Sequence, residues 1–138
     1  MAEKFSAEER AAMKEAAREA KLKLSRDESL ADTLAKIDTM TEADRKLALM
    51  VHEIAVAVHP DFEVRTWYGM PAYAIDGKVV LFYQDAAKFK VRYSTLGFQD
   101  PANLDEGLMW PTSYALTGDS KDVRARIKAL IEQAVSGR

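Results

Sequence analysis

The sequence predicts an α+β domain, in which helices at both ends of the chain flank a curved antiparallel sheet of about five strands. The first 60 residues contain no glycine and a single proline, Pro60, whereas all six glycines and the other three prolines follow it. Apolar residues recur at helical spacing before Pro60 and again near the C-terminus. Between these regions, an Asp-Gly pair separates two apolar stretches, as in a β-hairpin. We expect the N-terminal helices and the C-terminal helix to pack on one face of the sheet.

The first helix is expected to begin at Ser6 and to run to about Leu24, because Ser6 and Glu9 have the spacing of a capping box. Small side chains dominate its apolar face and bury little area, so we expect this helix to dock weakly, at an edge or against a second copy. The chain is therefore expected to be a monomer or a weak homodimer. The residues of this face are Met13, Ala16, Ala17, Ala20 and Leu24.

Two more helices are expected before Pro60, one capped by Ser29 and a longer one capped by Thr41. Pro60 disfavours helical backbone at the residue before it, so the longer helix should end at about Val58. Its apolar face is the most continuous in the sequence. The shorter helix presents Leu30, Leu34 and Ile37, and the longer one Leu47, Met50, Val51, Ile54 and Val58.

The sheet is expected to start after Phe62, where the apolar pattern changes period. Gly69 and Pro71 are expected to interrupt the first strand region, and Asp76-Gly77 predicts a two-residue hairpin turn. The strands predicted in this part of the chain are residues 64–67, 72–75 and 78–83.

Residues 88–94 alternate between apolar and basic side chains, which predicts a strand with one basic face. After a polar connection over residues 100–107, residues 110–116 are predicted to form the last strand. Ser120 or Asp119 is expected to cap a terminal helix. The apolar face of that helix is Val123, Ile127, Leu130, Ile131 and Ala134.

The chain has the size and composition of one domain, residues 1–138. Its net charge of −2 does not favour nucleic acid or anionic lipid as a partner. The absence of cysteine excludes disulfides, thiolate metal sites and cysteine nucleophiles. The charged N-terminus lacks the apolar stretch of a signal peptide, and no segment has the roughly 20 apolar residues of a membrane span. A soluble cytoplasmic protein is expected.

Aromatic side chains are concentrated in the predicted sheet, where residues 67–114 hold all seven tryptophans and tyrosines. Such side chains can line a pocket or fill a core, and both interpretations stay open. Lys88, Lys90 and Arg92 add cations that could hold an anion or simply keep a sheet face solvated. The predicted ligand-binding residues are Trp67, Tyr68, Met70, Tyr73, Lys88, Lys90, Arg92, Tyr93 and Trp110.

Catalytic patterns are not found in the sequence. No histidine follows His59, and there is no nucleophile elbow, phosphate loop or dinucleotide fingerprint. The histidines and carboxylates also lack a recognised metal-ligand spacing, so no metal site or cofactor is predicted. We therefore expect a non-enzymatic binding domain whose ligand is a small anion-bearing molecule or a partner peptide.

The string from Trp67 to Tyr73, the Asp76-Gly77-Lys78 hairpin and the segment from Lys88 to Tyr93 resemble the bacterial YdhG-like family of domains of unknown function. The resemblance covers residues 40–135, and residues 1–27 resemble an N-terminal helical extension carried by one subgroup. In many relatives the last strand reads Lys-Gly-Thr-Ile-Arg-Phe. Here the corresponding stretch runs from Trp110 to Leu116, so the basic pair of that strand is missing.

One member of this family is described as a frataxin-like iron chaperone, and the resemblance implies iron handling by surface carboxylates as an alternative function. The nearest equivalents of an acidic ridge are Glu8, Glu9, Glu15 and Glu19 of the first helix. These glutamates are interleaved with Lys and Arg, a pattern that is also typical of a solvated helix.

Overall fold

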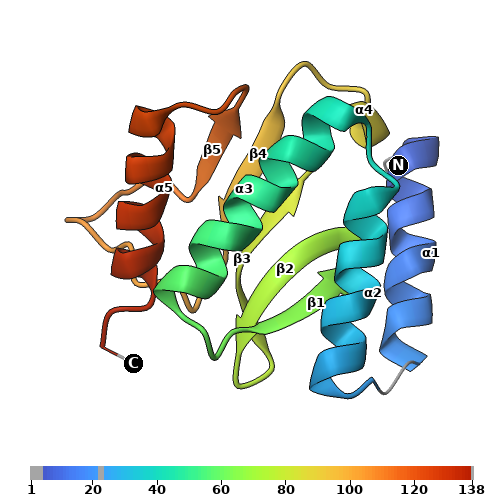
Figure 1. Ribbon diagram of the computed structural model, residues 1–138, viewed down its shortest axis with the longest axis horizontal. Helices are drawn as coiled ribbons and strands as arrows, with labels where there is room; N and C mark the ends of the chain where they lie inside the picture. Colours follow the sequence, from blue (N-terminus) through green and yellow to red (C-terminus); the bar gives the residue numbers. More distant parts are fainter. Residues whose placement is uncertain (1–4, 22–23, 138) are drawn as a thin grey trace.

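The computed structural model describes residues 5–21 and 24–137, and residues 1–4, 22–23 and 138 lie outside the described part (Figure 1). Five strands form one sheet in the order β1-β2-β3-β4-β5, and every neighbouring pair is antiparallel. The α+β fold class and the five-stranded antiparallel sheet are thereby confirmed. The described elements are α1 (Ala7–Lys21), α2 (Arg26–Asp38), α3 (Glu42–Val58), β1 (Glu63–Trp67), β2 (Met70–Ile75), β3 (Lys78–Gln84), α4 (Ala86–Phe89), β4 (Ser94–Phe98), β5 (Ser113–Leu116) and α5 (Lys121–Ala134).

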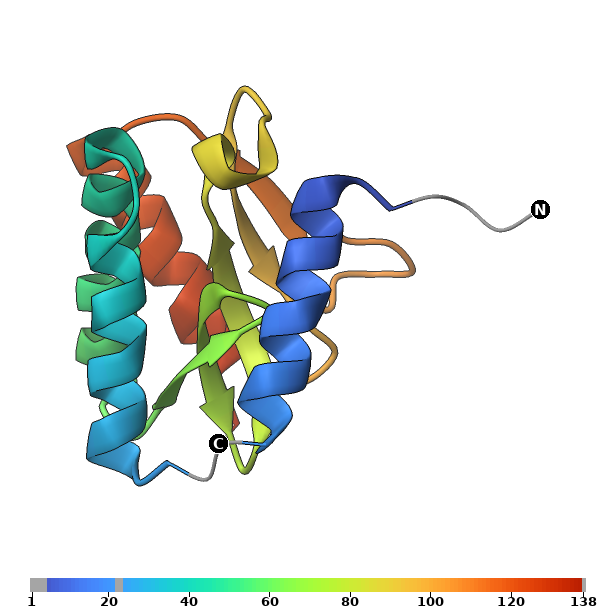
Figure 2. The same cartoon turned by 90° about the vertical axis from the view of Figure 1, so that its right-hand side faces the viewer.

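Helices lie on both sides of the sheet. Helices α2, α3 and α5 cover one face, whereas α1 runs alone across the other face (Figure 2). The N-terminal helices are therefore divided between the two faces. The short helix α4 follows β3 near the N-terminal end of α1. A side chain of the sheet that points away from the main core therefore lies on the same side as α1.

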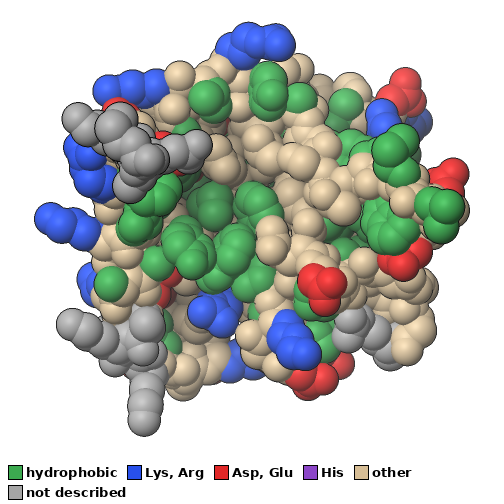
Figure 3. Space-filling view, turned by 180° about the vertical axis from the view of Figure 1, so that it is seen from behind, with side chains coloured by type: hydrophobic (Ala, Val, Ile, Leu, Met, Phe, Trp, Pro, Cys, Tyr) green, Lys and Arg blue, Asp and Glu red, His purple; other side chains and the backbone are tan. Residues whose placement is uncertain are grey.

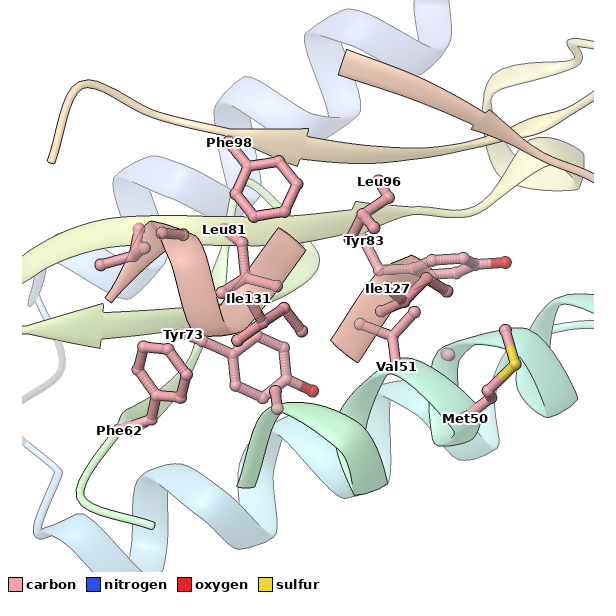
Figure 4. Packing of buried hydrophobic residues seen from close by; sticks show 14 of the residues in the cluster. Met50, Val51, Phe62, Tyr73, Leu81, Tyr83, Leu96, Phe98, Ile127 and Ile131 are labelled. Atoms are coloured by element: carbon pink, nitrogen blue, oxygen red, sulfur yellow. The ribbon is translucent and has the colours of Figure 1, made fainter. Parts of the chain in front are cut away.

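The main core fills the space between the sheet and the helices α3 and α5 (Figure 4). Phe62, Tyr73, Leu81 and Ile131 are almost or fully buried there, together with Val51 of α3. The rings of Phe62 and Tyr73 meet edge to face, with centroids 5.9 Å apart. The Tyr73 hydroxyl is satisfied by a 2.9 Å hydrogen bond with His52 Nδ1. Burial raises the pKa of the Tyr73 hydroxyl far above its ordinary value, so it stays protonated.

Most helix starts follow the expected caps. The Ser6–Glu9 capping box is present, and Thr41 and Ser120 accept hydrogen bonds from the first turns of α3 and α5. The prediction that Ser29 caps the second helix is wrong. Ser25 caps α2 instead, because Glu28 completes a capping box with it, and Ser29 Oγ donates to the Val64 carbonyl at 2.8 Å.

The first hairpin turn lies at Tyr68-Gly69, so Gly69 separates two strands as expected, whereas Pro71 lies inside β2 and does not interrupt it. Both turn residues have positive φ, 51° and 75°, and Trp67 pairs directly with Met70. This is the backbone of a tight two-residue hairpin, in which glycine relieves the strain at the second position. The predicted turn at Asp76-Gly77 is confirmed, with positive φ at both residues.

The prediction of a strand over residues 88–94 is wrong. Residues Ala86–Phe89 form α4, Lys90 adopts left-handed backbone with φ 55°, and β4 begins at Ser94. The cause is distant in sequence: the Asp44 carboxylate accepts the amides of Ala86 and Ala87, both at 3.0 Å, and turns the chain into a helix. Lys88, Lys90 and Arg92 therefore do not form a basic stripe on the sheet. The last strand is also shorter than expected, because it begins at Ser113.

Candidate ligand-binding site

Three of the predicted aromatic and aliphatic site residues meet on the α1 side of the sheet. Trp67, Tyr68 and Met70 line a shallow apolar hollow of about 290 Å³, together with Phe82 of β3. The Trp67 ring contacts those of Tyr68 and Phe82, with centroids 4.9 Å and 5.4 Å away. Seen from behind, apolar side chains gather in the middle of this face (Figure 3). The hollow is completed by Phe5, Glu9, Ala12, Met13, Gln84 and Phe89.

Tyr73 and Trp110 lie elsewhere. Tyr73 is fully buried in the main core on the opposite face of the sheet. Trp110 lies in the connection between β4 and β5, where it packs against the same core, and β5 is the edge strand farthest from β1. The predicted aromatic residues therefore do not share one hollow. Period-two alternation explains Tyr73, because Met70 and Tyr73 are an odd number of residues apart in β2.

The three predicted cations are also separated. The Arg92 guanidinium lies 5.2 Å from the centre of the Tyr93 ring, and both residues are exposed on the turn that follows α4. Lys90 Nζ donates to Glu8 Oε1 at 2.7 Å on the surface. Lys88 is the predicted cation that lies beside the hollow, because Phe89, the next residue of α4, lines it.

Lys88 belongs to a group that sequence reasoning missed, since its partner cation is Lys36 of α2. Lys88 Nζ lies 3.0 Å from Glu15 Oε1, and Lys36 Nζ lies 2.8 Å from Glu15 Oε2. The two ammonium groups thus hold one carboxylate of α1, and all three side chains are less than a third exposed. Burial acts to raise the pKa of Glu15, but the hydrogen bonds and charges of both lysines outweigh it and hold that pKa below its ordinary value.

A second anion-binding position lies next to the first. The amides of Tyr68 and Gly69 donate to the Glu19 carboxylate at 2.9 Å and 3.1 Å. Successive amides converge on one anion because both turn residues have left-handed backbone. Burial raises the pKa of Glu19 above its ordinary value, and these hydrogen bonds oppose that shift only in part.

Glu8, Ala12, Glu15 and Glu19 recur at helical spacing, so the side of α1 that contacts the domain is mainly acidic. The sequence alone did not separate this pattern from a solvated helix. The spacing of four, three and four residues does indicate one face of a helix. It does not identify the groups that this face contacts, because most partners of the three glutamates lie 49 to 82 residues away in the sequence. Helix α1 therefore docks largely through ion pairs and hydrogen bonds of its glutamates, which agrees with its small apolar face.

Beside the paired lysines lies a polar cleft of about 380 Å³, which is lined by Lys36, Thr39, Met40, Thr41, Gly69, Asp85, Ala87 and Lys88. Asp85 is only 5% exposed, and its Oδ1 atom has no hydrogen-bond partner among the described residues. Burial raises the pKa of Asp85, and the charge of Asp44 adds to this effect.

Asp44 positions the α4 side of this cleft. Besides the two α4 amides, its carboxylate accepts hydrogen bonds from the Tyr83 hydroxyl at 3.0 Å and Thr41 Oγ1 at 3.1 Å. Burial acts to raise the pKa of Asp44, but these four donors outweigh it and hold the pKa below its ordinary value. A charged, buried side chain of α3 thus fixes the helix that carries Lys88.

A larger crevice of about 500 Å³ lies between α2 and β1, but its inner polar groups already have partners. Asp32 accepts from Thr66 Oγ1 at 2.9 Å, and Ser29 donates to Val64. The cleft beside Lys88 combines two cations and an unpartnered acceptor, so it is the stronger candidate site.

Neither histidine lies in the cleft. His52 is paired with Tyr73 in the core, and His59 packs its ring against Phe62, so neither imidazole lines the cleft. Among residues 5–21 and 24–137, no group of three histidine or carboxylate side chains is close enough to hold a metal ion. The groups that do converge on the cleft and hollow are cations, one acceptor and apolar rings.

Comparison of the chain with protein-family models, with curated proteins and with solved structures gives no match. None of the described helices is long and apolar enough to cross a membrane.

Proposed function

We propose that this chain is a non-enzymatic binding domain of the YdhG-like type, and that it binds a small ligand that carries a carboxylate or phosphate. The observation that carries the proposal is the convergence of Lys36 and Lys88 on a single carboxylate beside an apolar hollow. Two cations from different helices make a site of definite geometry for one anionic group. The rest of the ligand would lie against the apolar hollow or in the polar cleft.

The hollow and the cleft are adjacent along two segments of the chain. Tyr68 lines the hollow and Gly69 lines the cleft, and in the same way Phe89 lines the hollow and Lys88 the cleft. A ligand whose anionic group lies between the lysines would therefore place an aromatic or aliphatic group within reach of Trp67 and Phe82. Most of the contact area of a small-molecule site is usually apolar, with a few polar groups that fix orientation.

Glu15 occupies the position that we assign to the anionic group of the ligand. The ligand must replace this carboxylate, so α1 acts as an internal competitor. This competition is weak enough to be overcome, because α1 buries few large apolar side chains: Met13, and Phe5 just before the helix, are both about half exposed.

The proposal is tested by titrating phenyl phosphate, a dianion with one aromatic ring, into the ¹⁵N-labelled protein. We expect shifts at Gly69, Ala87 and Lys88. Glu15→Gln should bind the probe about threefold or more tightly than the unaltered chain, because it removes the competing charge. Lys88→Met should lose most of the binding. Lys46→Met is the matched control, because Lys46 is an exposed lysine whose ion-pair partner is Glu42, and it should not change the affinity.

Shifts confined to residues remote from the cleft, or equal binding by Lys88→Met and the unaltered chain, would refute the proposal. The same spectra test the iron-handling alternative. Iron binding by α1 would require Glu8, Glu15 and Glu19 to leave their lysine and amide partners. Line broadening of these three residues by micromolar ferrous iron, without any response to phenyl phosphate, would favour that alternative.

A further inference from the structure

Asp85 stands at the N-cap position of α4, where an aspartate normally accepts amides of the first helical turn, yet its side chain makes no capping hydrogen bond. The reason is that Asp44 already accepts the amides of Ala86 and Ala87. Asp85 is therefore buried without the capping role that would explain an aspartate here. A buried polar atom without a partner costs free energy, so such an atom calls for an explanation.

The other polar groups that line the cleft have partners of their own. Thr39 Oγ1 donates to the Lys36 carbonyl at 2.6 Å, and Thr41 Oγ1 donates to Asp44. Both lysine ammonium groups are directed to Glu15. Within the described part of the chain, Asp85 Oδ1 is thus the buried side-chain acceptor of the cleft that has no donor.

We propose that the ligand also carries a hydrogen-bond donor, an ammonium or hydroxyl group, and that this group donates to Asp85 Oδ1 while the anion lies between Lys36 and Lys88. This inference rests on the proposed function and narrows it to one ligand class. The cleft, at about 380 Å³, has room for a small molecule of this kind. An anion alone would satisfy the lysines but leave the buried acceptor unpaired.

The experiment compares two matched series of probes, aminoalkyl phosphates and alkyl phosphates with two to four carbons. Both series present the phosphate to the lysines, and only the first presents a donor to Asp85. We expect the best aminoalkyl phosphate to bind about tenfold more tightly than its alkyl counterpart, as a charge-assisted hydrogen bond in a buried site allows. Asp85→Asn should abolish this preference, and Asp105→Asn, an exposed aspartate in the β4–β5 connection, should leave it intact.

A second measurement does not depend on any variant. The ¹³C resonance of the Asp85 carboxyl group in the unaltered protein should shift with the aminoalkyl phosphate and not with the alkyl phosphate. Equal affinity for the two series, or an unmoved Asp85 resonance, would overturn this inference and leave the proposed function standing. Failure of both series to bind at millimolar concentration would overturn this inference, and failure of phenyl phosphate as well would overturn both proposals.

Discussion

The two faces of the sheet are covered in different ways. On one face, α3 and α5 bury a continuous apolar core that includes Phe62, Tyr73 and Leu81. On the other face, α1 contacts the sheet and α4 mainly through Glu8, Glu15 and Glu19. Apolar burial depends little on salt or pH, whereas ion pairs that are partly open to water weaken when either changes. The comparison indicates that the domain is stabilised on one face and is adaptable on the other.

The largest effect is expected on the core face. Leu81→Ala should lower the free energy of unfolding by about 3 kcal/mol, because it leaves a cavity among fully buried side chains. Met13→Ala on α1 is the matched change on the other face, and it should cost less than about 1 kcal/mol because Met13 is about half exposed. Urea denaturation measures both. Equal losses would show that α1 contributes as much apolar stability as the core helices.

An intermediate effect is expected at Asp44, which connects the two faces. Asp44→Asn should cost about 2 kcal/mol, because a charged acceptor of four hydrogen bonds becomes a neutral one. The pKa of Asp44 is lowered, so its contribution is present above the ordinary aspartate value of 3.8 and is lost as the pH falls through the folded-state pKa. The unfolding free energy of the unaltered protein should therefore fall more steeply in acid than that of the variant. Parallel acid limbs would contradict this assignment.

The elements that could be predicted from the sequence are those with local causes. The turn at Asp76-Gly77, the Thr41 cap and the end of α3 at Val58 each depend on residues within one turn of the chain. The segment at residues 88–94 could not be predicted, because its alternating pattern favours a strand and the Asp44 carboxylate imposes a helix. A capping side chain more than forty residues away leaves no mark in the local pattern.

The candidate site was predicted in part for the same reason. Trp67, Tyr68 and Met70 are where the β1–β2 hairpin and its turn place them, whereas Lys88 lies beside the hollow for another reason, because helix α4 carries it. Lys36 could not be identified, because its place in the site depends on the packing of α2 beside the β1–β2 turn. Asp85 could not be identified either, because an aspartate before a helix is expected to cap it, and here Asp44 already accepts those amides. The spacing of the glutamates in α1 indicates an acidic helix face, but their partners can be identified only from the surface that this face contacts.

The smallest effect is expected on the docking of α1, and it should leave the core helix α3 unchanged. Glu15→Gln should weaken the docking of α1 by about 1 kcal/mol, since both lysines lose their ionic partner in a partly buried site. The pKa of Glu15 is lowered, so its contribution to stability is present above the ordinary value of 4.5 and is lost as the pH falls through the folded-state pKa.

Amide hydrogen exchange in Glu15→Gln should be faster in α1 and unchanged in α3, and high salt should produce the same pattern in the unaltered chain. Lys90→Ala removes a more exposed pair with Glu8, so it should speed exchange in α1 less than Glu15→Gln does and should leave α3 unchanged. Faster exchange in α3 to the same extent as in α1 would mean that the two faces open together, and the ligand would then have no separate path to Lys36 and Lys88.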